Sequence, residues 1–458
     1  MAGHEGEPIR IAVRELARFL GADIEDPRFL ADPHQCVTPA MRARPVHRLP
    51  GGAVTVLGHT ACSEVLRGAH FGHGAGELYE MTLLGLPARS FLQLDAPGHT
   101  RLRGQVARHF SVRRVQGLAQ SVAAHVRALV ADCRQGPGDF VTDVAEPLAM
   151  SVISDVLGVA DEDRPAFQRD ARLVVQGLDQ PARVTDERAT ARARFRFVRY
   201  FHQQVKARRA APTDDLVSTL LHRPDGTVAE VREVVTTCSL LLSAGYDTTV
   251  SLLSHAVAEL AGDRSGQGWD LARDTRTADA VVEEVLRLHS PVQIAPRAVV
   301  RDTDLQGVAL SRGTIVLPVL AFANRDPAVY EDPDVFRPQR HLRTHTSDRA
   351  QPRHLALGAG AHFCLGAALA RLTARHALSV LAVDPPMSRD EPRTYQDNVA
   401  VRGLRTLPVT WPNPSTAASR SRARRSTPAD AAPSCPALAV ADADLAHADL
   451  ADADQRNP

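Results

Sequence analysis

A cysteine, Cys364, lies between a glycine-rich turn and an apolar stretch that is typical of a helix, and these neighbours suit a metal-binding thiolate. Because Gly358, Gly360 and Gly366 carry no side chain, a flat ligand could approach the backbone closely. The N–H groups of the first helical residues can donate to the sulfur, and the positive helix N-terminus is expected to lower the pKa of the thiol. The alternative is a small buried cysteine without chemistry.

A second group of residues lies within 228–260, the longest helix that the sequence predicts. Ala244 and Thr248 are four residues apart and share one face, while Gly245 lets a ligand or water approach the backbone. The Thr248 hydroxyl can bond to the carbonyl four residues back and leave a polar notch, beside which Asp247 could supply protons. The alternative is that Ala244 and Gly245 only allow close helix packing, with Asp247 facing solvent.

Two pairs of charged residues have helical spacing. His99 and Arg103 are four residues apart and can point together at an anionic group, although a solvated basic face has the same spacing. Glu284 and Arg287 are three apart and can form a bidentate pair, to which Arg340 could be added. Exposed pairs of this kind are common, so this second spacing is weak when taken alone.

The run Gly358-x-Gly-x-His-x-Cys-x-Gly-x-x-Leu-Ala370 resembles the haem-ligand signature of the cytochrome P-450 family, the haem-thiolate monooxygenases. The resemblance implies haem b, with Cys364 as its iron ligand and metal site. Leu357 stands where the family usually has Phe, which leaves room for an altered haem environment without loss of ligation. Further motifs follow in the order of the family across most of 10–411, and the segment 244–248 resembles its oxygen-binding motif, Ala-Gly-x-Asp/Glu-Thr.

The resemblance also assigns roles to residues. It implies proton transfer to bound dioxygen through the catalytic residues Asp247 and Thr248. A structural role falls to Glu284, Arg287 and Arg340, with Glu283 as a less favoured partner of Arg287. The cofactor would be bound by a larger set, in which the propionates contact His99, Arg103, Arg297 and His362, and the remaining contacts come from Cys364, Ala244, Gly245, Gly358 and Gly366.

Composition and charge agree with a large enzyme that is mostly helical. The chain has 458 residues, a net charge of +1 and only 4% aromatic residues, so nucleic acid is not an expected partner. Its six scattered cysteines show no zinc spacing, and no apolar stretch approaches the roughly twenty residues that span a bilayer. We therefore expect a reduced, cytoplasmic protein without a membrane segment.

The fold class expected is mainly α (α+β), the cytochrome P450 fold with a small β-rich region. Short strands are predicted at 53–57, 298–300 and 314–318, and a long mobile loop at 68–91. The haem-thiolate domain is predicted to cover 1–412. Residues 413–458 are rich in Ala, Ser, Arg, Pro and Asp, which favours a disordered tail, with an interaction role as the alternative.

The resemblance implies a monooxygenase that inserts one atom of O2 into an apolar small molecule, by hydroxylation or epoxidation, in natural-product metabolism. It also implies a monomer that receives electrons from a ferredoxin and ferredoxin reductase, because the chain has no cysteine cluster for an iron–sulfur centre. The substrate could be tethered to a carrier protein. The alternatives are peroxide use or oxidative coupling on the same cofactor, a haem carrier or sensor, and a helical protein without cofactor.

Overall fold

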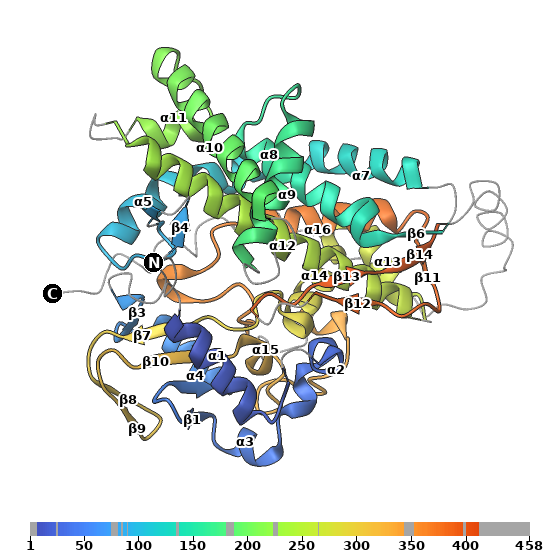
Figure 1. The fold of residues 1–458 in the computed structure, drawn as a ribbon. Helices are drawn as coiled ribbons and strands as arrows, with labels where there is room; N and C mark the ends of the chain where they lie inside the picture. Colours follow the sequence, from blue (N-terminus) through green and yellow to red (C-terminus); the bar gives the residue numbers. More distant parts are fainter. Residues whose placement is uncertain are drawn as a thin grey trace, which may run out of the picture. The chain divides into compact units, whose positions relative to one another are not determined.

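A long helix, α12 (Val231–Gly262), runs through the middle of the computed structural model (Figure 1). The structure describes residues 7–23, 26–74, 81–83, 86–88, 90–133, 137–179, 187–222, 228–263, 265–342, 352–396 and 400–411. All of them belong to one unit that spans residues 1–413. The tail predicted for 413–458 lies outside the described residues.

The helices that pack directly on α12 include α8 (Glu146–Leu157), α10 (Glu187–Ala210), α14 (Thr275–His289) and α16 (Ala367–Leu381). Earlier in the chain lie α1 (Glu7–Phe19), α2 (Pro27–Ala31), α3 (Pro39–Ala43), α4 (His59–Arg67), α5 (Gly98–Ala107), α6 (Val112–Gly117) and α7 (Ala119–Cys133). The others are α9 (Arg164–Asp179), α11 (Leu216–Leu221), α13 (Gln267–Arg273) and α15 (Leu320–Ala323). The main hydrophobic core fills the space between α12 and its neighbours.

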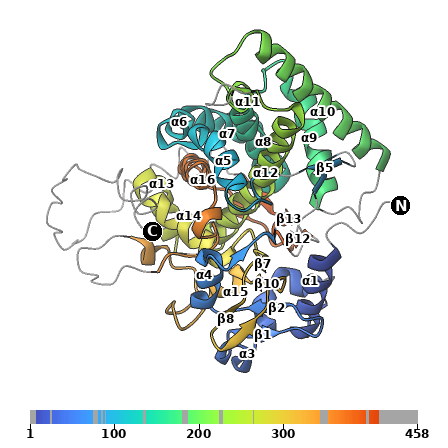
Figure 2. The same cartoon turned by 90° about the vertical axis from the view of Figure 1, so that its left-hand side faces the viewer.

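The largest sheet lies with α1, α3 and α4 on one side of α12, whereas α7 to α11 lie on the other side (Figures 1 and 2). Its strands follow the order β1 (Val46–Arg48), β2 (Val54–Val56), β10 (Ile315–Pro318), β7 (Arg297–Val299) and β3 (Phe71–Gly72). The central strand β10 pairs in parallel with β2, where Val316 faces Val54, and antiparallel with β7, where Ile315 faces Ala298.

The remaining strands form small antiparallel sheets. One contains β11 (Met387–Ser388), β14 (Pro408–Thr410) and β6 (Pro137–Asp139), and the paired strands are β4 (Met81–Leu83) with β5 (Leu86–Ala88), β8 (Thr303–Leu305) with β9 (Val308–Leu310), and β12 (Thr394–Tyr395) with β13 (Leu404–Thr406). The mainly α fold with small β regions is therefore confirmed. None of the described helices is both long enough and apolar enough to cross a bilayer.

The prediction of a long loop over residues 68–91 is wrong in part. The structure places β3 within it, joined to β7, and pairs β4 with β5. The glycines of this segment obscured the short strands, which are held by pairing with distant residues and not by their own periodicity. Residues 75–80, 84, 85 and 89 of the predicted loop lie outside the described residues.

Two buried histidines connect α12 to α14. The rings of His255 and His289 stack with centroids 4.3 Å apart, and the Arg402 guanidinium lies 3.4 Å from Nε2 of His255 and 3.2 Å from Nδ1 of His289. The other ring nitrogens face Ser251 O at 2.8 Å and Glu259 Oε1 at 2.8 Å. Since arginine can only donate, both rings accept from it, which requires neutral imidazoles. Burial, together with Arg402, lowers the pKa of both histidines well below 6.5.

This pair predicts a loss of stability in mild acid. Below a pH of about 6.5 the unfolded chain takes up protons that the folded His255 and His289 exclude, so their contribution is present above that pH and is lost as the pH falls. The free energy of unfolding is expected to fall by up to about 1.4 kcal/mol per pH unit for each histidine. Denaturant unfolding of the wild type and a His255→Asn/His289→Gln variant at several pH values between 7.5 and 5.5 measures it.

The variant is expected to show a shallower pH dependence than the wild type. An exposed histidine on the chain, His70, supplies the control, because His70→Asn should leave the wild-type slope unchanged. Equal slopes in the wild type and the double variant would show that the pair does not exclude protons.

Candidate functional site

The cysteine turn lies between a single 3-10 turn, Gly360–His362, and α16. The Gly358 N–H donates to Leu355 O at 2.8 Å, and the Cys364 N–H donates to Leu357 O at 2.8 Å, so the turn is closed on both sides of the glycines. Gly358 has φ +71° and Gly360 has φ +69°, the left-handed region that favours glycine. A Cβ at Gly360 would also lie 2.4 Å from Leu66 O of α4. The turn is therefore fixed against α4 by backbone contact.

The surroundings of Cys364 differ from those of the buried cysteines Cys62 and Cys238. Cys364 is only half-buried, and the Gly366 N–H, Arg103 and Arg371 all act to stabilise its thiolate. Cys62 and Cys238 are fully buried, and no positive side chain acts on either thiol. Burial still raises the pKa of the Cys364 thiol above its ordinary value, which corrects the lowered pKa expected from the helix N-terminus alone. A metal ion would complete the stabilisation of the thiolate that these groups begin.

A cluster of imidazoles lies beside the cysteine turn. The His362 ring is 4.2 Å from the ring of His99, on α5, and 4.3 Å from the ring of His73, which follows β3. Arg297, at the start of β7, is buried and donates to Pro296 O at 2.9 Å. Burial, then His73, His99 and Arg297, lower the pKa of His362 to about 2. Arg297 remains the fixed positive charge of this cluster, so an anion beside it would be stabilised.

Two observations at α5 bear on this cluster. Nε2 of His99 is buried and has no hydrogen-bond partner among the described residues. A buried nitrogen of this kind needs a partner, and here a ligand would supply it. Arg103, one turn further along α5, donates to Phe363 O at 2.5 Å. The structure therefore places Arg103 against Phe363 of the cysteine turn and His99 against the ring of His362. The two side chains, one helical turn apart on α5, thus contact different residues.

The predicted notch in α12 is formed by Thr248, whose Oγ1 donates to Ala244 O at 2.6 Å. This is the bond to the carbonyl four residues back that the sequence predicts, although α12 remains α-helical through it. A Cβ at Gly245 would lie 3.0 Å from Cδ1 of Ile153 on α8, so the contact of Gly245 is the one expected from close helix packing. Asp247 is half-buried.

Glu284 lies at the centre of a buried ionic network. Its carboxylate accepts from Arg287 at 2.8 and 2.9 Å and from Arg340 Nε at 2.9 Å, and it also bonds His341 and the Arg337 N–H. Burial acts to raise the pKa of Glu284, but these donors outweigh it, and the pKa is well below its usual range. The predicted association of Glu284, Arg287 and Arg340 is thus present in the structure.

Glu283, the less favoured partner of Arg287, has a separate pairing. Its carboxylate accepts from Arg371 at 2.6 and 2.9 Å and lies 3.2 Å from Nε2 of His354. Since Arg371 also acts on the Cys364 thiol, this pair connects α14 to the cysteine turn. Glu283 therefore anchors the segment at the cysteine turn, and Glu284 anchors the segment that precedes it.

A family model described as Cytochrome P450 matches residues 268–382. Cytochrome P450 monooxygenase PikC of Streptomyces venezuelae is 35% identical over 334 residues, 70% of this chain and 76% of that protein. Vitamin D(3) 25-hydroxylase of Pseudonocardia autotrophica is 32% identical over 406 residues, 85% of this chain and 96% of that protein. The chain belongs to the cytochrome P450 family.

Among solved structures, P450BioI in complex with hexadec-9Z-enoic acid ligated acyl carrier protein matches this P450 with a TM-score of 0.73 and 29% identity, over 84% of this chain and 99% of that one. This P450 is a monooxygenase of the haem-dependent class, as its relatives are. The residues present fit a haem group. The donor set around the Cys364 sulfur suits an anionic iron ligand, and the buried His99 Nε2, which has no hydrogen-bond partner among the described residues, suits a propionate.

Sequence reasoning missed His73 and Asp95 in this P450. Both Asp95 oxygens accept from the His73 N–H at 3.0 Å, and both residues lie at the imidazole cluster. Asp95 lies 22 positions from His73 in the sequence, so no local spacing indicates their contact. At Leu357, where the sequence departs from the family pattern, the carbonyl accepts from the Cys364 N–H at 2.8 Å and the side chain packs against the main hydrophobic core.

Proposed function

We propose that this P450 uses haem b to insert one atom of O2 into an apolar natural product, by hydroxylation or epoxidation. The observation that carries the proposal is the Cys364 sulfur, which accepts from the Gly366 N–H and is acted on by the positive charges of Arg103 and Arg371. The name of the Pseudonocardia autotrophica relative gives vitamin D(3) as the compound that it hydroxylates. The P450BioI structure is a complex with an acyl carrier protein that carries hexadec-9Z-enoic acid. They support an apolar substrate, either free or tethered to a carrier.

In this proposal Cys364 ligates the iron, and Gly358, Gly366 and Ala244 leave room for the flat ring, whereas Gly245, also predicted as a haem contact, packs against Ile153. The propionates are held by His99, Arg103, Arg297 and His362. Glu284, Arg287 and Arg340 hold the segment that precedes the cysteine turn. A separate ferredoxin and its reductase supply electrons to a monomeric enzyme, since the scattered cysteines offer no iron–sulfur cluster of its own.

When bound, the haem activates dioxygen with two electrons and two protons, so that one oxygen atom enters the substrate and the other leaves as water. The task of the chain is to deliver protons at this point. Thr248 Oγ1 holds its proton on Ala244 O at 2.6 Å and can turn to donate it toward the substrate side. The half-buried Asp247 carboxyl then supplies protons to this hydroxyl from solvent.

Thr248→Ala is expected to separate electron use from product formation. The variant removes the Oγ1 proton donor and leaves the helix intact, so NADPH oxidation with a surrogate ferredoxin continues while product falls by about 100-fold. Hydrogen peroxide should account for the missing electrons. Product, peroxide and NADPH measured in the same reaction test this expectation.

Thr249→Ala is the matched control, because it removes a threonine hydroxyl from the next residue of α12. It should couple electrons to product as the wild type does. If Thr248→Ala also retained full coupling, Thr248 would have no part in proton delivery.

The proposed reaction is tested by screening apolar compounds for a shift of the Soret band, followed by turnover of the responding compounds under ¹⁸O-labelled dioxygen. Incorporation of one labelled atom per product is expected. An unlabelled product would instead indicate oxidative coupling, and turnover that requires only peroxide would remove the need for a ferredoxin. A spectrum that responds to an acyl carrier protein conjugate and not to the free acid would identify a tethered substrate.

A further inference from the structure

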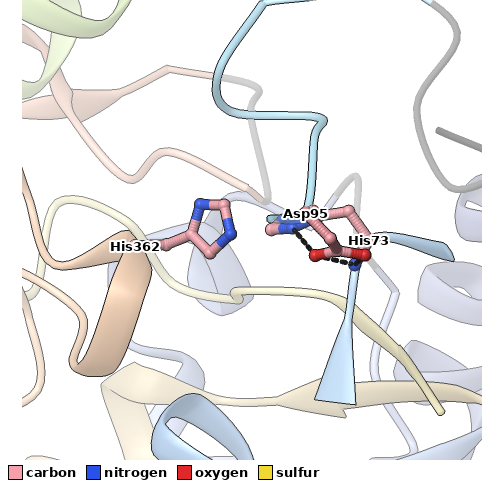
Figure 3. A group of neighbouring side chains, drawn as sticks. All are labelled: His73, Asp95 and His362. Atoms are coloured by element: carbon pink, nitrogen blue, oxygen red, sulfur yellow. Dashed lines mark hydrogen bonds and ion pairs between the residues drawn. The ribbon is translucent and has the colours of Figure 1, made fainter. Parts of the chain in front are cut away.

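Asp95 fixes the backbone of His73 and lies beside its ring (Figure 3). His73 is 1% exposed, and its backbone N–H donates to both carboxylate oxygens of Asp95 at 3.0 Å. Glycine at position 72 leaves room for this arrangement, because a Cβ there would lie 2.7 to 2.9 Å from the Asp95 carboxylate and displace it. Asp95 therefore occupies the space of a missing side chain and ties the end of β3 to the start of α5.

The imidazole of His73 points into the cluster beside the cysteine turn. Its Nδ1 lies 3.7 Å from Oδ1 of Asp95, and its ring meets the His362 ring edge-on, with centroids 4.3 Å apart and planes at 65°. A carboxylate on the Nδ1 side favours the proton of the neutral ring on that nitrogen, so Nδ1 is the ring donor of His73. The His73 ring therefore lies at the cluster with its donor nitrogen on the Asp95 side.

The spacing of this cluster alone would also suit a metal ion, since one ligand atom each from His73, Asp95 and His362 lie within 4.8 Å of one another. The surroundings favour an anion instead. Arg297 is 7% exposed and acts on both His73 and His362, and the His99 ring lies against His362. Arg297 is a fixed positive charge that acts on both His73 and His362, and it opposes a divalent cation and attracts a carboxylate.

We propose that His73 is a further haem-binding residue, which donates from its ring to the propionate that His362 and Arg297 also contact, and that Asp95 is its positioning residue. This inference rests on the proposed function, because it needs haem at the cysteine turn. The role belongs to the end of β3, a segment that none of the other proposed haem contacts uses.

Haem release into an excess of apomyoglobin, followed by absorbance, tests the role of His73 independently of turnover. His73→Phe keeps a ring of similar size but removes both nitrogens, and is expected to release haem about 10- to 100-fold faster than the wild type. His73→Gln retains a donor and should release haem within about threefold of the wild-type rate. His70→Phe, an exposed position three residues earlier, should match the wild type.

The outcomes separate the two proposals. A wild-type protein that takes up no haem overturns the proposed function, and the role of His73 with it. Wild-type uptake with unchanged release from His73→Phe overturns the role of His73 alone, as does equally fast release from His73→Phe and His73→Gln, which would indicate lost packing and not a lost donor. Asp95→Asn, which cannot pair with the ring as an anion, is expected to give an increase smaller than that of His73→Phe.

Discussion

Replacing Cys364 with serine is expected to abolish the absorption near about 450 nm of the reduced protein with carbon monoxide, a band that depends on a thiolate ligand. Serine keeps the size of the side chain and the closed turn. Its hydroxyl has a much higher pKa than a thiol, and the Gly366 N–H, Arg103 and Arg371 cannot offset that difference. Substrate oxidation should fall by more than the roughly 100-fold typical for loss of an outer-shell partner.

The control for this substitution is Cys36→Ser, at another partly exposed cysteine on the chain. It should retain both the spectrum and the turnover of the wild type. Retention of full pigment and turnover by Cys364→Ser would exclude position 364 as the iron ligand and, with it, the proposed function.

Glu284→Gln is expected to lower the free energy of unfolding by about 3–5 kcal/mol, because it leaves charged arginines buried without their carboxylate. The side chains of Arg287 and Arg340 are 0% and 1% exposed, so water cannot replace the lost partner. Denaturant unfolding at neutral pH measures the change. Much of the variant should be recovered as insoluble protein, since this loss is a large fraction of the stability of a typical domain.

Glu331→Gln tests whether burial is the cause. Glu331 pairs with Arg337 at 3.0 Å, but its side chain is 80% exposed, so the expected change is below about 1 kcal/mol. Similar losses of unfolding free energy in Glu284→Gln and Glu331→Gln would show that burial does not make the Glu284 network more stabilising than an exposed ion pair. A stable Glu284→Gln protein would mean that Arg287 and Arg340 are satisfied by the carbonyls that they also contact.

Residues whose partners are close in the sequence could be predicted from it. Thr248 bonds Ala244 and Glu284 bonds Arg287 because helical spacing brings positions three and four apart together. Cys364 was found in the same way, because its glycines belong to one short turn. The pairing of Arg340 with Glu284 spans 56 positions, and only the family resemblance predicted it.

Residues whose surroundings depend on distant segments could not be predicted. His73 meets His362 only because β3 joins the largest sheet beside β7. Helix α4 was missed because it is short and its N-cap Gly58 provides no side-chain bond, so burial of Ala61, Cys62, Val65 and Leu66 decides its formation. The pKa of Cys364 had the wrong expected direction for a related reason, since local sequence reveals a helix N-terminus but not desolvation.

The central strand of the largest sheet also affects how the protein is made. Thr55 of β2 bonds to Leu317 of β10, 262 positions later, and β10 separates β2 from β7. A ribosome that adds about 5–20 residues per second needs roughly 13–50 seconds to bridge that interval. Throughout it the edge of β2 that pairs with β10 in the folded protein has no partner strand, and an unpaired strand edge of this kind favours aggregation.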